Sequence, residues 1–435
     1  MFGTVITQKD SFGNSADKVL DYRNGNEITK WSFFKFLGPA FLVSVGYMDP
    51  GNWATDIDAG ARFGYKLLWV ILLSNIIAIL LQTLSAKLGI ATGKDLAQNC
   101  KEKYSKPVNI GLWFTAEMAM IATDFAEFMG SAIAIKLIFN IPLLEATIIT
   151  GIDVFLILAL QRYGFRWVET AIILFVATIM FCYVIELFFA EPQWGLVPGG
   201  LLKPSINSSS ILVAIGILGA TVMPHNLYLH SNIIQTRFLY NRDNFEIKKK
   251  VLGFAKLDNV IALNMAFFVN AAILVMSAAA FGSRGLEVAE IEQAHITLEY
   301  LFGASAALVF AIALLASGIS SSTTGTMAGQ IVMEGFLNIK IRPWLRRIIL
   351  RLLVMIPAII AIAVGIDPLR MLVLSQVVLS FQLPFAIIPL LVFTSDKKLM
   401  GNFANKKWVS LLGILSAVVI IALNIYLLYA TFEGI

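Results

Sequence analysis

The sequence predicts an all-α polytopic membrane protein with eleven membrane-spanning helices, ten of which form two inverted five-helix repeats. Three observations predict this fold class. First, 58% of the 435 residues are hydrophobic and 14% are charged, whereas soluble domains carry roughly 25% charged residues. Second, eleven apolar segments long enough to cross a bilayer follow one another along the chain. Third, the first and sixth of these segments are each interrupted by proline and polar residues.

A bilayer core of ~30 Å requires about 20 apolar residues in a helix. Segments of this kind lie near residues 36–64, 66–90, 108–139, 143–161, 165–189, 210–238, 256–281, 297–335, 345–366, 368–394 and 408–432. They divide the chain into a polar N-terminal segment, two repeats, and a loop with the eleventh segment. The corresponding boundaries are 1–35, 36–209, 210–394 and 395–435.

The lysines and arginines orient these segments. With the N-terminus in the cytoplasm, the segments placed inside hold 27 of the 33 Lys and Arg residues, as the positive-inside rule requires. We therefore expect a multi-pass protein of the cell (plasma or inner) membrane, with its N-terminus cytoplasmic and its C-terminus outside. The net charge of +5 then reflects topology and not nucleic-acid binding. Residues 1–35 contain no apolar h-region, so no cleavable signal peptide is expected.

The first segment contains the stretch GYMDPGN at residues 46–52. The apolar run before it covers only about 16 Å as a helix, which is too short to cross. Pro50 has no N–H and its ring clashes with the preceding turn, while Gly51 permits unusual dihedral angles. The helix is therefore predicted to unwind in mid-membrane.

The sixth segment repeats this pattern. Residues 216–226 read GILGATVMPHN, and aligning Pro50 on Pro224 also aligns Asn52 on Asn226. Unwound backbone at membrane depth survives only where protein or a water-filled cavity satisfies its polar groups. Interrupted segments at matching positions of two halves point to a transporter binding site. Since each half has five helices, the second half is inverted relative to the first.

The two breaks supply a mixed donor set. Asp49 offers a carboxylate, Asn52 an amide oxygen and Met223 a thioether sulfur, while the backbone near Gly46 and Ala220 offers carbonyls freed from helical partners. Carboxylate and carbonyl ligands suit Mn²⁺, and a thioether favours softer ions over Mg²⁺ or Ca²⁺. We therefore expect a divalent transition-metal site between the breaks.

Ionisable residues in the apolar segments suggest a second pathway. Glu117, Asp124 and Glu127 fall within about 80° on one face of the third segment, so this face must meet water, a cation or the bundle interior. His225 follows Met223 and has a side chain suited to proton exchange near neutral pH. His230 can share this route, although both histidines also fit as hydrogen-bonded interior residues.

The ninth segment begins RPWLRRIILR, which places Arg346, Arg347 and Arg351 close together. These arginines are either a cytoplasmic topology signal or partners for the carboxylates of the third segment.

Several motifs resemble the Nramp family of proton-coupled divalent-metal transporters. They are DPGN in the first segment, MPHN in the sixth, TDFAEFMG at 123–130, SSSTTGTMAGQ at 320–330 and SQVVLSFQLPFA at 375–386. The resemblance implies a LeuT-type fold and import of Mn²⁺ or Fe²⁺ with protons. It also implies that Asp49, Asn52, Met223 and the Gly46 and Ala220 carbonyls bind metal, joined by Gln376 in some states.

The resemblance further implies a charged proton path. We expect Asp124 to be the principal proton acceptor, tuned by Glu127 and Arg347, with Glu117, Arg346, His225 and His230 along the route. No cofactor and no obligatory protein partner is expected beyond metal ions, protons and the lipid bilayer.

Four alternatives remain at this point. They are a Mg²⁺ transporter of the same fold, a sodium-coupled organic-solute symporter, a passive metal channel and a membrane metalloenzyme. An enzyme is not expected, because the sequence contains no HExxH or GxSxG motif.

Overall fold

The structure is a computed structural model, and it describes residues 36–152, 165–207, 210–237, 244–286, 288, 290–339, 342–365 and 368–433. Within these ranges every regular element is a helix and no strand occurs, so the predicted all-helical architecture is confirmed.

The first half of the chain supplies the helices of segments one to five. They are α2 (Pro39–Val45), η2 (Gly46–Met48), α3 (Pro50–Phe63), η3 (Gly64–Leu67), α4 (Leu68–Thr92), α5 (Leu96–Lys103), α6 (Lys106–Phe139), α7 (Leu143–Thr150) and α9 (Phe165–Ala190). The predicted segment 143–161 is described only up to residue 152.

The second half supplies the helices of segments six to eleven. After the short helix α10 (Val197–Leu202), which connects the two halves, they are α11 (Ile211–Thr221), α12 (Pro224–Ile233), η4 (Ile234–Arg237), α13 (Phe245–Ala280), η5 (Gly282–Arg284), α14 (Ile291–Phe302), α15 (Ala304–Leu337), α16 (Pro343–Ala363), α17 (Pro368–Ser395), α18 (Lys397–Met400), η6 (Gly401–Phe403) and α19 (Lys407–Glu433).

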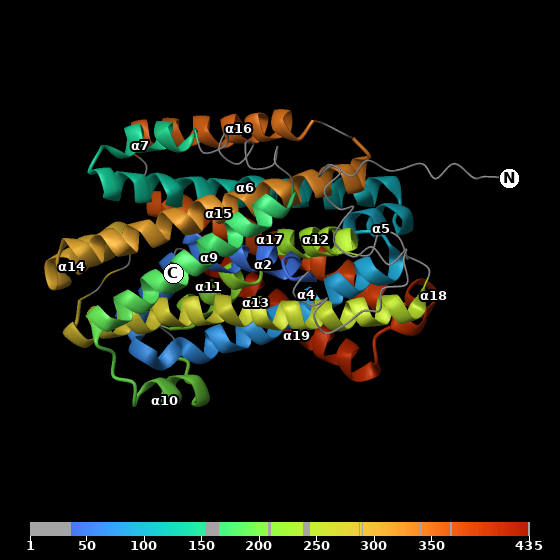
Figure 1. The fold of residues 1–435 in the computed structure, drawn as a ribbon, viewed down its shortest axis with the longest axis horizontal. Coiled ribbons are helices and arrows are strands. Elements are labelled where there is room, and N and C mark those ends of the chain that lie inside the picture. Colours follow the sequence, from blue (N-terminus) through green and yellow to red (C-terminus); the bar gives the residue numbers. More distant parts are fainter. Residues whose placement is uncertain are drawn as a thin grey trace.

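The long helices run along the longest axis of the molecule, and short helices mark its two ends. In Figure 1, α10 and α14 lie at one end, whereas α5 and α18 lie at the other. Seven helical stretches among the described residues are long and apolar enough to cross a membrane, and three shorter apolar helices accompany them. The two interrupted helices lie among these long helices.

Two predicted boundaries differ from the structure. The segment 297–335 is divided at Gly303, whose φ of +89° ends α14 and starts α15. Helix α13 begins at residue 245, well before the predicted 256, because Asn244 caps it through the N–H groups of Glu246 and Ile247. A hydropathy window does not register this extra part, since its residues are largely polar.

Small residues let the helices approach one another closely. A Cβ atom on Gly60 of α3 would lie 2.4 Å from the Leu274 carbonyl oxygen of α13, and one on Gly89 of α4 would lie 2.2 Å from that of Ser231. Such contacts are typical of helix packing in membranes, where small residues bring backbones together.

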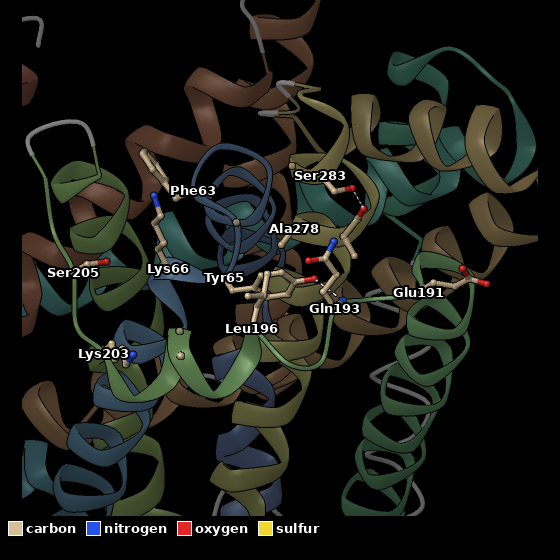
Figure 2. A pocket seen from close by; sticks show the side chains of 15 residues that line it. Phe63, Tyr65, Lys66, Glu191, Gln193, Leu196, Lys203, Ser205, Ala278 and Ser283 are labelled. Carbon is tan, nitrogen blue, oxygen red and sulfur yellow. Dashed lines mark hydrogen bonds between the residues drawn. The ribbon is translucent and has the colours of Figure 1, made fainter.

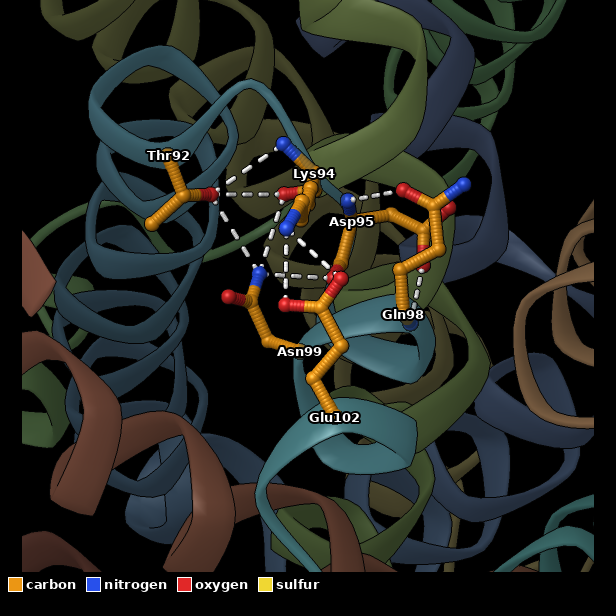
Figure 3. Close-up of polar contacts among 6 residues, drawn as sticks. All are labelled: Thr92, Lys94, Asp95, Gln98, Asn99 and Glu102. Carbon is orange, nitrogen blue, oxygen red and sulfur yellow. Dashed lines mark hydrogen bonds and ion pairs between the residues drawn. The ribbon is translucent and has the colours of Figure 1, made fainter.

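The turn between α4 and α5 is a compact polar structure (Figure 3). Gly93 adopts a left-handed conformation (φ +68°) that ends α4. Asp95 and Gln98 form a capping box that starts α5, with the Gln98 N–H donating to Asp95 Oδ1 at 2.8 Å. The second carboxylate oxygen of Asp95 accepts a hydrogen bond from Asn232 Nδ2 at 2.9 Å. This contact ties the turn to the end of the α12 helix.

At the opposite end, α10 packs on η3 (Figure 2). A Cβ atom on Gly200 would lie 2.1 Å from the Tyr65 carbonyl oxygen, so the contact requires glycine. The Tyr65 hydroxyl accepts a hydrogen bond from the Gln193 N–H at 3.1 Å. A cavity of about 650 Å³ lies beside this contact and is lined in part by Lys66 and Lys203.

The N-terminal end of α2 is held by buried charged side chains. Arg237 forms an ion pair with Glu169 of α9. Its Nε also donates to the Phe36 carbonyl at 3.0 Å. Asp258 of α13 accepts a hydrogen bond from the Ala40 N–H at 2.9 Å. The start of the first segment is therefore held through its main chain.

Candidate functional site

The first break joins α2 to α3 through η2 and Asp49. Asp49 is extended, with φ −71° and ψ 166°, and Pro50 occupies the first turn of α3, where a missing N–H removes no helical bond. Asp49 Oδ1 accepts a hydrogen bond from the Asn52 N–H at 2.9 Å. The sequence DPGN thus ends one half-helix and caps the next.

The second break has the same construction. Helix α11 ends at Thr221, and Met223 is extended, with φ −86° and ψ 126°. Met223 is the N-cap residue of α12, which is the position that Asp49 occupies in α3. The predicted unwinding of both segments is therefore present, and the two predicted ligands stand at equivalent places in the repeat.

The two breaks contact each other through Asn52. Its Nδ2 donates to Asp49 Oδ1 at 2.6 Å and to the Ala220 carbonyl at 3.3 Å. Its Oδ1 accepts from the Thr221 hydroxyl at 3.4 Å. The structure thus brings together Asp49, Asn52 and Ala220, three of the residues that the sequence predicted as metal ligands.

Asn226 belongs to this group, although the sequence analysis gave it no role. It packs against Gly46, where a Cβ atom would lie 2.4 Å from Asn226 Nδ2. Asn226 is fully buried, and neither of its side-chain polar atoms has a hydrogen-bond partner among the described residues. Its alignment with Asn52 in the repeat was the signal that could have identified it.

The carbonyls released at the first break are satisfied by neighbouring helices. Asn270 Nδ2 of α13 donates to the Tyr47 carbonyl at 2.9 Å. The Met48 carbonyl accepts from Trp53 Nε1 at 3.1 Å and from the Ser317 hydroxyl of α15 at 2.5 Å. The unwound turn therefore persists at membrane depth, because protein groups replace the lost helical bonds.

Helix α6 lies directly against the first break. A Cβ atom on Gly130 would lie 2.2 Å from Cγ of Pro50. Only glycine leaves room for this approach, which brings the acidic face of α6 next to Asp49.

The site combines hard and soft donors in a dry environment. Asp49, Asn52 and Met223 are 0%, 1% and 1% exposed. Asp49 Oδ2 has no hydrogen-bond partner among the described residues. One free carboxylate oxygen, an amide and a thioether fit a divalent transition metal better than Mg²⁺, which usually binds oxygens and retains waters.

Two of the three predicted carboxylates of α6 form ion pairs with arginines of α16. Arg346 Nη2 lies 2.7 Å from Glu117 Oε1, and Arg351 Nη1 lies 3.7 Å from Asp124 Oδ1. The Ser322 hydroxyl of α15 bridges the second pair, since it donates to Asp124 at 3.2 Å and accepts from Arg351 at 3.0 Å. Arg351, which the sequence analysis placed only in the arginine cluster, is thus the partner of Asp124.

Glu127 lies on α6 between Asp124, which faces Arg351, and Gly130, which contacts the first break. It is fully buried beside Gly325, where a Cβ atom would lie 2.9 Å from Glu127 Oε2. It interacts electrostatically with Asp124 and Arg351 on one side and with Asp49 on the other. A continuous series of ionisable groups therefore leads away from the break along α6.

The two predicted histidines face different helices. His225 Nδ1 lies 3.4 Å from the Thr123 hydroxyl of α6, whereas His230 Nδ1 lies 3.0 Å from Gln82 Oε1 of α4. Gln82 also donates to the Tyr47 hydroxyl at 2.8 Å. Only His225 lies beside the acidic face of α6, so the structure separates the two residues.

Two predicted residues cannot be placed. The side chains of Gln376 on α17 and Arg347 on α16 lie outside the described part of the structure. Both remain predictions from the sequence.

Comparisons with known proteins show what this chain is similar to. The model of the Nramp family, described as natural resistance-associated macrophage protein-like, matches residues 40–430. The divalent metal cation transporter MntH of Mesorhizobium japonicum is 50% identical over 412 residues, which are 92% of this chain and 90% of that protein. The natural resistance-associated macrophage protein 2 homolog of Dictyostelium discoideum is 46% identical over 433 residues, covering 96% of this chain and 69% of the homolog.

Solved structures agree with this similarity. The crystal structure of the Eremococcus coleocola manganese transporter superposes with a TM-score of 0.85 at 36% identity, covering 92% of this chain and 87% of that chain. Mhp1, a nucleobase-cation-symport-1 family transporter, gives a TM-score of 0.59 at 14% identity, covering 92% and 93%. At this low identity the second likeness concerns the fold alone. The predicted LeuT-like fold is confirmed.

Proposed function

This chain belongs to the Nramp family and is a divalent metal cation transporter, and from this premise we propose that it imports Mn²⁺, Fe²⁺ and similar ions into the cytoplasm, coupled to protons, by alternating access. The observation that carries the proposal is the meeting of the two helix breaks at Asn52, which contacts both Asp49 and the Ala220 carbonyl, with Met223 at the N-cap of the second break. The selectivity for Mn²⁺, the coupling to protons and the direction of transport are parts of this proposal.

The metal site uses groups from both repeats. Asp49 Oδ2 and Met223 Sδ are the charged and the soft ligand, and the Asn52 amide contributes oxygen. The Asn52 amide already contacts the Ala220 carbonyl at 3.3 Å. A metal ion that binds the Asn52 oxygen therefore also lies close to this carbonyl. The Gly46 carbonyl and Gln376 complete the proposed set.

The burial of these ligands supports alternating access. Asp49, Asn52 and Met223 are at most 1% exposed, so an ion reaches them only after helices have moved. The half-helices α2, α3, α11 and α12 are the natural moving parts, because each ends at the site and can tilt about its break.

Proton movement is assigned to the acidic face of α6. Asp124 accepts the proton, and its pairing with Arg351 at 3.7 Å gives the charged form a partner at membrane depth. Glu127 couples this event to the metal through its electrostatic interaction with Asp49. Protons that leave toward Arg346 and Glu117 need not follow the path by which the metal ion leaves the site.

The test is Mn²⁺ uptake by the purified full-length protein in proteoliposomes. Uptake is measured with and without an inward proton gradient, with Mg²⁺ and Ca²⁺ as competitors, for the wild type and Met223→Ala. Met276→Ala on α13, a buried methionine that belongs to neither break, is the matched control.

We expect the gradient to accelerate wild-type uptake, and we expect Mg²⁺ or Ca²⁺ to compete only in Met223→Ala. Gradient-independent uptake would favour a passive channel. Equal competition by Mg²⁺ in all three proteins would favour a Mg²⁺ transporter and reject the role of the thioether. Absence of Mn²⁺ uptake in the wild type would favour a different substrate, such as that of an organic-solute symporter.

A further inference from the structure

A second cavity lies on the side of the bundle, away from both helix breaks. It has a volume of about 690 Å³ and lies between α4, α13 and α19, next to η6. It exists because α19 packs mainly against α17 and α11 and only slightly against α4. Its volume is within the usual range for small-molecule sites, about 300–1,000 Å³.

Most of the cavity wall is apolar and comes from membrane-spanning helices. Its apolar residues include Leu73, Ile76 and Leu80 of α4 and Leu412 and Leu415 of α19. Ile76, Leu412 and Leu415 are 57%, 43% and 66% exposed. A groove that exposes such side chains at membrane depth is in contact with lipid chains.

One end of the same cavity is strongly positive. Lys87 of α4, Lys256 of α13 and Lys406 before α19 line it, and none of the described lining residues is Asp or Glu. Lys87 and Lys256 are close enough to repel each other. Lys87 Nζ donates to the neutral side chain of Asn405. The charge of these three lysines is therefore not balanced by any acid that lines the cavity.

The charge distribution predicts that the positive end lies at the membrane surface. The three lysines come from the stretches 87–106, 237–256 and 397–407, all of which the charge distribution predicts to be cytoplasmic. Trp408 lines the same end and is 60% exposed, and tryptophan is enriched where lipid head groups meet the acyl chains. The nearby Asp396 pairs instead with Lys103, at 3.7 Å.

We propose that this cavity binds an anionic glycerophospholipid of the cytoplasmic leaflet. The phosphate lies between Lys87, Lys256 and Lys406, and one acyl chain occupies the groove between α4 and α19. Basic pockets between membrane helices on the cytoplasmic side bind anionic head groups in this way. An extended peptide does not fit, because the apolar wall offers no partners for its backbone polar groups.

The test measures lipid binding by native mass spectrometry of the full-length protein after delipidation in detergent. The probes are dioleoyl phosphatidylglycerol and dioleoyl phosphatidylcholine. The test variant is Lys256→Gln/Lys406→Gln. The control is Lys250→Gln/Lys407→Gln, which removes two exposed lysines from the same region without touching the cavity.

We expect the wild type to bind phosphatidylglycerol at least about tenfold more tightly than phosphatidylcholine. Each lysine near a membrane surface contributes roughly a fivefold effect, so the test variant should bind phosphatidylglycerol about 30-fold more weakly. The control should change by less than about threefold. An equal loss in both variants, or no preference in the wild type, would overturn the proposal.

Two further probes separate a lipid from a soluble phosphate. Glycerol 3-phosphate should not displace phosphatidylglycerol, and the dihexanoyl form should bind at least about tenfold more weakly than the dioleoyl form, because each buried CH₂ contributes to affinity. Displacement by glycerol 3-phosphate, or equal binding of the short-chain form, would also overturn the proposal.

Discussion

Asn52 on α3 and Ala220 on α11 are joined by a hydrogen bond of 3.3 Å from the side-chain amide of the first to the carbonyl of the second. This bond connects the two repeats at the point where both helices are unwound. It also shares one amide between a proposed metal ligand, Asp49, and the opposite repeat.

Asn52→Ala is therefore expected to weaken Mn²⁺ binding by about 10–100-fold, the usual effect of removing a group that holds or orients a metal ligand. The measurement is isothermal titration of the purified protein with Mn²⁺. Asn264→Ala is the control, because this amide contacts Asn75 at 3.2 Å away from the breaks. Equal weakening in both variants would contradict the proposed role of Asn52.

Asp124→Asn tests the proton route. The substitution keeps the hydrogen bond with Ser322 possible but removes the charge that faces Arg351. We expect the pH dependence of Mn²⁺ uptake to flatten, while the Kd for Mn²⁺ changes by less than about threefold. A large loss of Mn²⁺ binding with an unchanged pH profile would refute the assignment. The control is Glu145→Gln on α7, an exposed acid.

Gly130→Ala tests the contact between α6 and the first break. A Cβ atom there would lie 2.2 Å from Pro50, and overpacking costs typically about 1–3 kcal/mol. We expect a lower Tm in detergent and slower Mn²⁺ uptake. Gly111→Ala on the same helix has open space around the new methyl group and should raise the Tm slightly, because alanine favours helices. A matching fall in both variants would show that the contact with Pro50 is unimportant.

Asp95 predicts a dependence of stability on pH. Burial raises its pKa from 3.8 to about 6, although hydrogen bonds from Gln98 and Asn232 oppose the shift. The folded state thus holds this proton more tightly than the unfolded state. The contribution of Asp95 to the free energy of unfolding is complete below about pH 4 and is lost as the pH rises through about 6.

Asp95→Asn should therefore flatten the fall in Tm between about pH 4 and 6, measured by thermal unfolding in detergent. Asp396→Asn is the contrast, since a backbone hydrogen bond from Lys398 lowers the pKa of this partly exposed acid. The contribution of Asp396 to the free energy of unfolding is lost only below about pH 4. Its substitution should therefore leave the dependence of Tm on pH between about pH 4 and 6 unchanged. If Asp95→Asn showed the same fall in Tm with pH as the wild type, Asp95 would be excluded as the cause of this fall.

The positions of the two breaks could be predicted from sequence because their causes are local. Pro50 and Pro224 interrupt apolar runs, and neither needs a distant partner to end a helix. The acidic face of α6 could be predicted for the same reason, since helical periodicity alone places Glu117 and Asp124 together.

The pairing between charged residues could not be predicted in this way. Whether Arg351 or Arg347 meets Asp124 depends on how α16 lies against α6 and α15, and the sequence of α16 does not contain this information. The same holds for His230, which faces Gln82 of α4. The packing of Asn226 on Gly46 likewise depends on the contact between the repeats.

The hydrogen bonds that hold the main chain at the start of α2 have a consequence for sequence variation. Arg237 holds the carbonyl of Phe36, and Asp258 holds the N–H of Ala40. Every residue has the carbonyl, and every residue except proline has the N–H. Other substitutions at Phe36 and Ala40 therefore change the packing of their side chains and leave these main-chain hydrogen bonds intact. Gly38 is the exception, because a Cβ atom there would lie 2.7 Å from Glu169 Oε1. The side chains that hold the start of α2 thus come mostly from other parts of the chain. Homologous chains can therefore differ at residues 36–40 and keep these contacts.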